Sequence, residues 1–265
     1  MIKDITIGQY IPGKSYLHKT DPRVKIVLTI LIMAVLLVID TYPGFGIFTM
    51  FILSVIFSSG IPLRYTLKGL KPVLFIIIFT AVINLFSGQG TPIFNLGFLK
   101  ITYESIDMTV KMTLRLSLLI MTASLLTLTT TPIMLTDGIE KLMNPLRRIG
   151  VPSHEIAMMM TIALRFIPTL LEETDKIMKA QAARGADFDT GNLIQRAKSF
   201  VPVLVPLFVS AFRRADELAN AMEARCYRGS EGRTRMRQLK VTGTDYIVSA
   251  VAILFMAMVL YLQYM

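Results

Sequence analysis

Apolar runs alternate with short polar breaks in the first half of the chain, and one more such run ends it. The runs are Ile26 to Ile39, Tyr42 to Leu63, Pro72 to Gly90, Ile106 to Thr131 and Tyr246 to Met265. A membrane-spanning helix needs about 20 predominantly apolar residues. The first run is short, but Arg23 and Lys25 at its start can extend their charged ends to the membrane surface. The pattern predicts five transmembrane helices.

The chain between Pro132 and Asp245 is more polar and contains two long runs with helical spacing of apolar residues. The first, His154 to Gly185, stops at a glycine suited to a left-handed cap, and the second extends from about Gly191 to Arg225. We expect neither run to be apolar enough to cross a bilayer. Internal prolines should bend both helices, which would lie along the membrane face and partly enter it. These prolines are Pro168, Pro202 and Pro206.

Composition agrees with this pattern, because 53% of the residues are hydrophobic while the net charge is +10. The predicted fold class is an all-α polytopic membrane protein with about five transmembrane helices and a cytoplasmic module of long crossed helices. Residues 1–131 would form an N-terminal tail and transmembrane helices 1 to 4, residues 132–245 the long helices of the cytoplasmic module, and residues 246–265 transmembrane helix 5.

Lysine and arginine are distributed unevenly over the two sides of this predicted topology. With the N-terminus, the Arg64 to Lys71 turn and the Pro132 to Asp245 module on one side, only Lys100, Lys111 and Arg115 remain elsewhere. The positive-inside rule makes the richer side the cytoplasm. We therefore expect a multi-pass plasma membrane protein with a cytoplasmic N-terminus and an outside C-terminus. Tyrosines suited to the outer interface are Tyr42, Tyr103, Tyr261 and Tyr264.

Charged residues inside the fourth predicted span form a stripe. Asp107, Lys111 and Arg115 are four residues apart, so they share one helical face on which opposite charges can pair. One interpretation is an interfacial stripe packed against the bundle. The other is a polar contact with a partner or substrate.

Motifs for catalysis and metal binding are missing. The sequence has no GxxxxGK[ST] and no HExxH, and the adjacent carboxylates Glu172 and Glu173 have no histidine nearby. One cysteine and two histidines leave little for a metal site. We expect no enzyme activity and no cofactor in this chain. The basic segment Arg225 to Lys240 is interpreted as a topology signal and lipid-headgroup contact rather than a nucleic-acid site. A channel or self-sufficient carrier is disfavoured, because we find no inverted repeat.

Both long runs end on an alanine, an arginine and a small residue. Small residues let a helix end enter a narrow cleft, where the guanidinium can bind a carboxylate or carbonyl of a partner. An ordinary helix cap is the alternative. The two triplets are Ala183, Arg184 and Gly185, and Ala224, Arg225 and Cys226.

The 17 methionines are also open to two interpretations, as core filling or as an adaptable apolar groove.

Several motifs together resemble a known family. They are Asp21-Pro22-Arg23-Val24-Lys25, Ala163-Leu164-Arg165-Phe166-Ile167-Pro168, Ala183-Arg184-Gly185 and Ala221-Met222-Glu223-Ala224-Arg225-Cys226-Tyr227-Arg228-Gly229. Nearly end to end, the chain resembles the transmembrane scaffold, or T component, of energy-coupling factor (ECF) transporters. Cys226 departs from the usual small third residue of the triplet, although cysteine is still compact.

The resemblance implies a non-catalytic coupling subunit of an ABC importer for vitamins or metal ions. Arg184 and Arg225 would each dock into the groove of one of two ATPases, which bind ATP and Mg²⁺, and the long helices would carry ATPase motion to a membrane-embedded substrate-binding S component. The alternative is the membrane subunit of another multi-subunit ATP-driven transporter with its own substrate pathway. Residues expected to contact the S component are Met158, Met159, Leu164, Pro168, Phe200, Phe208 and Phe212.

Overall fold

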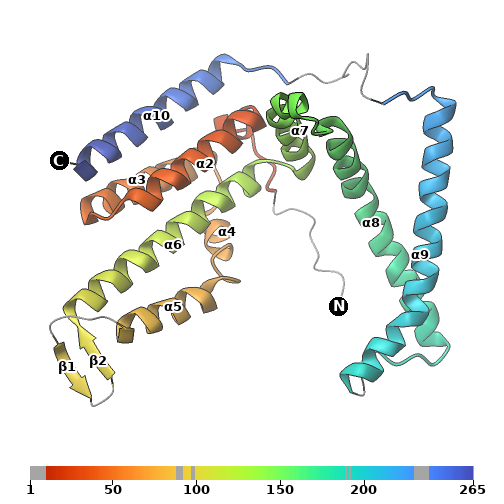
Figure 1. Ribbon diagram of the computed structural model, residues 1–265, viewed down its shortest axis with the longest axis horizontal. Helices are drawn as coiled ribbons and strands as arrows, with labels where there is room; N and C mark the ends of the chain where they lie inside the picture. Colours follow the sequence, from red (N-terminus) through yellow and green to blue (C-terminus); the bar gives the residue numbers. More distant parts are fainter. Residues whose placement is uncertain are drawn as a thin grey trace. The chain divides into compact units, whose positions relative to one another are not determined.

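The computed structural model describes residues 10–87, 92–96, 99–188, 190, 192–229 and 239–264, and most of these residues are helical (Figure 1). This confirms the predicted all-α fold class. The chain divides into two compact units, of which one contains residues 10–141 and 239–264 and the other residues 142–229. The elements of the first unit are α1 Tyr16–Lys19, α2 Pro22–Val38, α3 Tyr42–Ser59, α4 Leu63–Lys68, α5 Leu74–Ser87, β1 Pro92–Leu96, β2 Leu99–Thr102, α6 Tyr103–Thr129, most of α7 Pro132–Met143, and α10 Gly243–Tyr264. Those of the second are η1 Asn144–Ile149, α8 Ser153–Ala183 and α9 Leu193–Ala224.

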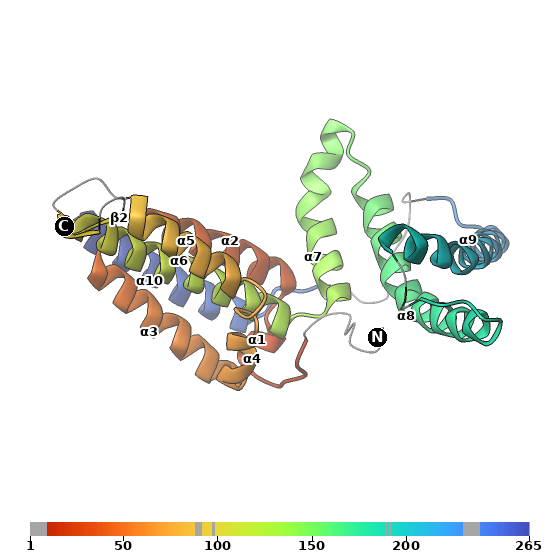
Figure 2. The same ribbon diagram turned by 90° about the horizontal axis from the view of Figure 1, so that it is seen from below.

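The core of the first unit lies among α2, α3, α6 and α10, which run side by side (Figures 1 and 2). Its buried side chains recur every three or four residues, because each helix turns one face inward. They are Leu28, Ile32 and Leu36 of α2, Phe45, Phe48, Ile52 and Ile56 of α3, Leu118, Met121 and Leu125 of α6, and Ala252, Met256 and Val259 of α10. The helix α5 packs against α6.

The outward faces of these helices are also apolar. Ile30, Met50, Phe75 and Leu254 all have more than half of their surface exposed, and Phe75 reaches 76%. A helix that is hydrophobic on every side suits a lipid environment, whereas a helix in water has a polar outer face. The exposed apolar surface of this unit is therefore the surface of a membrane bundle.

Each of the five predicted spans contains a helix, but the helices differ in length. By length and composition, α3, α6 and α10 can cross a membrane, whereas α2 has 17 residues and α5 has 14. The long helix α8 meets the same criterion, so the expectation that neither long run is apolar enough to cross is wrong for α8. Its N-terminal half, from Ile156 to Leu171, carries only Arg165 as a charged residue, and the polar C-terminal half obscured this in the sequence.

At one end of the bundle, the predicted charged stripe of α6 contacts the turn between α2 and α3. Lys111 pairs with Asp107 at 2.7 Å and lies over the ring of Tyr42, whose hydroxyl donates to Asp107. Arg115 pairs with Asp40 at 2.6 Å. The predicted pairing of opposite charges is confirmed for Asp107 and Lys111. The stripe thus joins α6 to the α2–α3 turn, as in the packing interpretation.

At the other end, the Asp-Pro-Arg motif joins the beginnings of α2 and α10. Asp21 accepts hydrogen bonds from the Arg23 guanidinium at 2.7 and 3.0 Å and from the Arg23 backbone N–H at 2.9 Å, and so caps α2. The backbone N–H of Asp21 donates to Asp245 at 2.8 Å, and Asp245 also accepts from the backbone and hydroxyl of Thr242. Two segments more than 200 residues apart in sequence are held together by these bonds.

The polar segment before α6 contains an antiparallel hairpin of β1 and β2 that the sequence analysis did not predict. It leads directly into a capping box at the start of α6. The Ser105 backbone N–H donates to the Thr102 hydroxyl at 3.2 Å, and the Thr102 N–H donates to the Ser105 hydroxyl at 3.1 Å. The helix therefore begins at Tyr103, three residues before the predicted span.

The helix α7 begins at Pro132 and ends at Met143 (Figure 2). It packs on the start of α2 through Gly138. A Cβ atom at this glycine would lie 3.0 Å from the Ile26 side chain and 3.3 Å from that of Pro22. A side chain at position 138 would therefore require Ile26 and Pro22 to shift by a few tenths of an ångström.

Candidate docking site on the long helices

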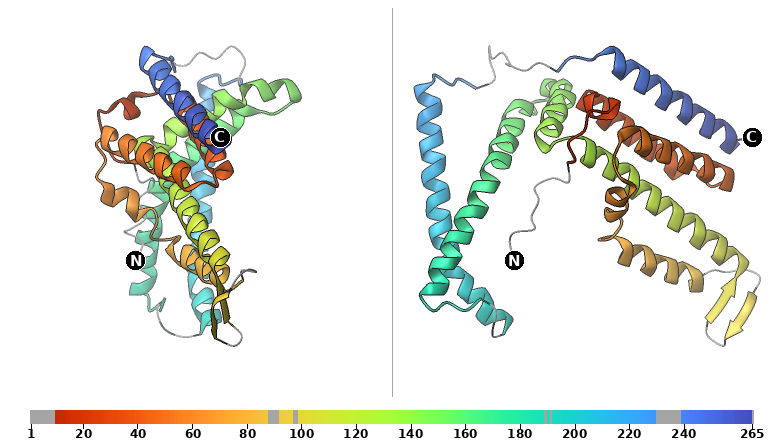
Figure 3. Two further views of the ribbon diagram at one scale, coloured as in Figure 1. Left: turned by 90° about the vertical axis from the view of Figure 1, so that its left-hand side faces the viewer. Right: turned by 180° about the vertical axis from the view of Figure 1, so that it is seen from behind.

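The second unit consists mainly of α8 and α9, which run in opposite directions (Figure 3). Between them, the Gln181 side chain donates to the carbonyl of Pro202 at 3.4 Å, and the rings of Phe188 and Phe200 lie 5.3 Å apart. Both helices continue through their internal prolines. The axis of α9 bends in its first half, where Pro202 and Pro206 leave backbone carbonyls without helical donors (Figure 3).

The first Ala-Arg-small triplet is the C-terminal cap of α8. Arg184 is the C-cap residue and Gly185 follows in the left-handed conformation with φ of 91°. The N–H of Ala186 donates to the carbonyl of Gln181, and that of Gly185 donates to the carbonyl of Ala182, both at 3.0 Å. This pair of bonds is a Schellman motif, which confirms the predicted left-handed glycine cap.

The second triplet caps α9 with the same geometry. Arg225 is the C-cap residue, and the N–H groups of Cys226 and Tyr227 donate to the carbonyls of Glu223 and Met222 at 2.8 and 3.0 Å. Cys226 occupies the glycine position with φ of 55°, and no other non-glycine residue in the described part of the chain has positive φ. A Cβ atom in this region is strained, so Cys226 is held there by the cap.

Both capping arginines project from the unit. Arg184 and Arg225 are exposed, and so are Ala183 and Ala224 beside them. No hydrogen bond or ion pair joins either guanidinium to a described residue. Because α8 and α9 are antiparallel, the two caps lie at opposite ends of the pair. Arg225 follows Pro202 by 23 residues, or up to about 35 Å along a helix, whereas Arg184 lies just beyond the Gln181–Pro202 contact. The unit thus presents two matched basic tips that are well separated.

A polar clamp fixes the crossing of α8 and α9 between these tips. Glu173 of α8 accepts from the hydroxyl of Ser210, and its second oxygen pairs with Arg214 at 2.7 Å. Ser210 is buried and the other two side chains are partly buried. Because these buried and partly buried groups hydrogen-bond in only one arrangement, they specify how α8 and α9 are placed at this point. Apolar contacts alone would let the two helices slide along each other.

Comparison with known proteins agrees with the motifs. A family model described as CbiQ, cobalt transport protein, matches residues 13–236. The energy-coupling factor transporter transmembrane protein EcfT of Ruminiclostridium cellulolyticum is 64% identical over 264 residues, which cover 100% of this chain and 99% of that relative. The protein of the same name from Clostridium kluyveri is 58% identical, over 96% of this chain and 94% of that relative. The one from Bacillus subtilis is 46% identical, over 99% of this chain and 100% of that relative. The chain belongs to the family of energy-coupling factor transporter transmembrane proteins.

In this ECF transmembrane protein, the residues predicted to contact an S component differ in their exposure. Met159, Phe208 and Phe212 are 58%, 60% and 69% exposed, and Phe200 and Pro168 are exposed as well. Met158 and Leu164 are only partly exposed. The exposed residues of α9 continue as one apolar face, because positions three and four apart lie on one side of a helix. This face consists of Val201, Leu204, Val205, Phe208, Val209 and Phe212.

The clamp of this ECF transmembrane protein was missed in the sequence. Glu173 was considered only as a possible catalytic carboxylate, and its partners are 37 and 41 residues away. The sequence did contain a pattern that indicates the clamp. Ser210 interrupts the apolar half of α9 and Arg214 follows its end, both on the side opposite Phe208 and Phe212. Polar residues on the otherwise apolar inner face of a helix indicate a buried polar partner.

Proposed function

We propose that this chain is the non-catalytic coupling subunit of an ATP-driven importer and joins two ATPase subunits to a membrane-embedded S component that binds a vitamin or metal ion. The observation that carries the proposal is the pair of matching arginine caps at opposite ends of the antiparallel α8–α9 pair. Two equivalent binding tips call for two equivalent partners. ATP and Mg²⁺ would be bound by those partners.

Each arginine cap is suited to entering a groove on an ATPase. The alanine and the small third residue add little width to the helix end, and the guanidinium can form two parallel hydrogen bonds with a carboxylate. Lysine offers the same charge without that planar geometry. A buried hydrogen bond to a charged group is worth roughly 1.5 to 3 kcal/mol, so loss of one arginine should lower the affinity for one ATPase subunit by about ten- to a hundred-fold.

The apolar face of α9, together with Met159 and Pro168 of α8, is the proposed seat for the S component. It offers apolar area without charged residues, so an apolar partner can bind and shift along it without breaking hydrogen bonds. The Glu173 clamp would make the two helices move as one body. Displacement of the arginine tips by the ATPases would then reach the seat.

The proposed topology places the N-terminus and the arginine-capped ends of α8 and α9 in the cytoplasm and the C-terminus outside. It rests on the excess of lysine and arginine on one side of the predicted spans. It also puts both arginine caps in the compartment that contains ATP.

Co-purification from membranes tests the function, because the two partner sites can be removed separately. The double variant Arg184→Ala, Arg225→Ala should retain the S component and lose both ATPases. Phe208→Asp should retain both ATPases and lose the S component, because a charge would have to be buried in an apolar contact. Val241→Asp, also at an exposed apolar position but outside the seat, is the matched control. Retention of all partners by both test variants would refute the proposal.

A further inference from the structure

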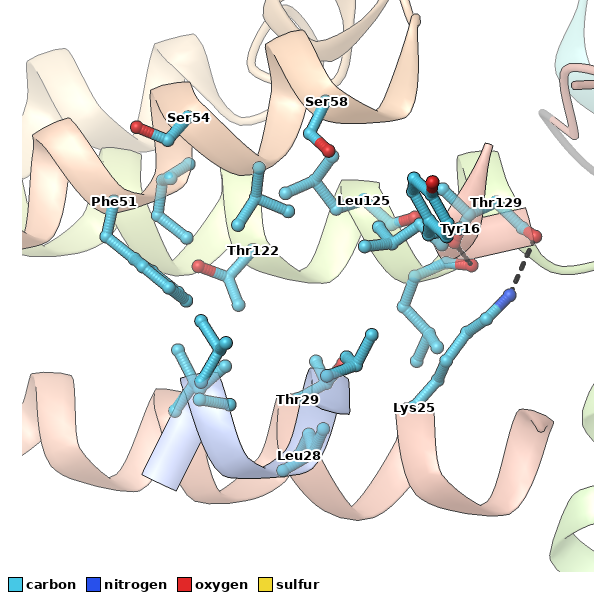
Figure 4. A pocket seen from close by; sticks show the side chains of 18 of the residues that line it. Tyr16, Lys25, Leu28, Thr29, Phe51, Ser54, Ser58, Thr122, Leu125 and Thr129 are labelled. Atoms are coloured by element: carbon cyan, nitrogen blue, oxygen red, sulfur yellow. Dashed lines mark hydrogen bonds between the residues drawn. The ribbon is translucent and has the colours of Figure 1, made fainter. Parts of the chain in front are cut away.

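The membrane bundle contains a cavity of about 410 Å³ that the coupling function does not use (Figure 4). Its lining comes from α1, α2, α3, α6 and α10, and includes the buried core residues Leu28 and Leu125. At one end, Phe51 lines the cavity and stacks on Phe255 of α10 with ring centroids 3.8 Å apart. At the other end lie Tyr16 and Lys25.

The cavity is open along one side. Of the residues that line it, Ser54 and Ser58 of α3 and Ile247 and Val251 of α10 are exposed. These helices belong to the bundle whose outer surface is apolar, so the opening faces lipid rather than water. A long apolar chain could enter from the bilayer without crossing the protein.

Among the described residues that line the cavity, Lys25 alone is charged. Its side chain is directed from α2 toward the end of α6 (Figure 4), where Nζ donates to the Thr129 carbonyl at 3.1 Å and the Thr130 hydroxyl at 3.2 Å. Lys25 is 7% exposed, so the expectation that its side chain extends to the membrane surface is wrong. The last carbonyls of α6 lack helical donors and attract a cation, which explains this placement.

The charge of Lys25 lacks a direct counter-ion. No described carboxylate lies within ion-pair distance of its Nζ atom. Two acids attract Lys25 from a distance: Asp21, which also pairs with Arg23, and Asp245, which accepts hydrogen bonds from Thr242 and the Asp21 backbone. The ammonium group has three N–H donors, of which the two hydrogen bonds to α6 use two. A buried cation with a donor to spare beside a cavity favours an anion there.

We propose that the cavity is a binding site for one anionic phospholipid, with an acyl chain lying between Phe51 and Tyr16 and the phosphate accepting a hydrogen bond from Lys25. The apolar lining suits the chain and the single cation suits the phosphate. The side opening lets the second acyl chain stay in the bilayer, which favours a phospholipid over a free fatty acid.

Photo-crosslinking in nanodiscs tests the site with phosphatidylglycerol and phosphatidylcholine probes that carry the same photoreactive acyl chain. The phosphatidylglycerol probe should label peptides from the cavity segments of α3 and α6 about five-fold more than the phosphatidylcholine probe, because one lysine favours a net negative headgroup over a zwitterionic one by about 1 kcal/mol. Ser54→Phe should abolish this labelling by filling the cavity. Met50→Phe, one turn earlier on α3 and outside the lining, should leave it unchanged.

Lys25→Gln separates the lipid site from the helix cap, because the amide can still donate to Thr129 but carries no charge. It should bring labelling by the two probes to the same level while the thermal unfolding midpoint stays within the range of the other variants. Equal labelling by both probes in the unchanged protein, or labelling insensitive to Ser54→Phe, would overturn the proposal. Displacement by oleate but not by unlabelled phosphatidylglycerol would instead assign the cavity to a fatty acid and overturn it as well.

Discussion

Glu173→Ala should uncouple ATP hydrolysis from transport, because it removes the clamp between α8 and α9. Glu173 accepts hydrogen bonds from Ser210 and Arg214. The Glu173 and Arg214 side chains are 23% and 34% exposed, so water screens their ion pair and its coupling energy should be about 1 kcal/mol rather than the larger value of a buried pair. That energy corresponds to a roughly five-fold change in the equilibrium between the state in which the clamp holds α8 and α9 together and the state in which it is open.

The magnitude can be measured with a double-mutant cycle of Glu173→Ala and Arg214→Ala, read from hydrogen exchange of α8 and α9 amides in nanodiscs. Lys179→Ala is the matched control, because it breaks an exposed ion pair with Asp175 within α8 alone. In reconstituted vesicles, Glu173→Ala should keep most of the ATPase rate and transport less substrate per ATP, whereas Lys179→Ala should behave as the unchanged protein. A coupling energy near zero, or unchanged transport per ATP, would refute a mechanical role for the clamp.

Three further predictions concern the caps, the topology and the Asp-Pro-Arg motif. Cys226→Gly should raise the thermal unfolding midpoint through relief of roughly 1 kcal/mol of left-handed strain, while Gly185→Ala should lower it; a lower midpoint for Cys226→Gly would contradict the cap assignment. In a Cys226→Ser background, Lys68→Cys should be shielded from impermeant thiol reagents in intact cells and Tyr103→Cys should react, and the reverse pattern would invert the proposed topology. Burial raises the pKa of Asp21, but hydrogen bonds and charge from Arg23 lower it more, so the pKa lies below the ordinary 3.8. The stability that Asp21 contributes is therefore complete above pH 3.8 and is lost as the pH falls through the folded-state pKa. Asp21→Asn should make the unfolding free energy depend less on pH in this acid range. An unchanged pH dependence would assign the acid sensitivity to other groups.

The helices and their ends could be predicted because their signals are local. Apolar runs located α2, α3, α5, α6 and α10 to within a few residues, and Gly185 marked the end of α8 through its conformational freedom. The pairing of Asp107 with Lys111 was also visible, because both lie on one helix face.

Contacts between distant segments could not be predicted in the same way. Nothing local indicates that Arg115 pairs with Asp40, that Glu173 meets Arg214, or that Lys25 turns inward to the end of α6. Each depends on which helices become neighbours, and a single sequence does not specify that. The β1–β2 hairpin was missed for a different reason, since its strands are short and lie in a segment rich in turn-forming residues.

The number of ATPase subunits per purified complex tests the central claim most directly. Native mass spectrometry of the complex should find two ATPases with the unchanged chain, predominantly one with Arg184→Ala or Arg225→Ala, and none with the double variant. Arg184→Lys and Arg225→Lys should rescue poorly, because lysine lacks the planar guanidinium. A double variant that still carries two ATPases at normal membrane levels would contradict the account and leave the arginines as ordinary helix caps.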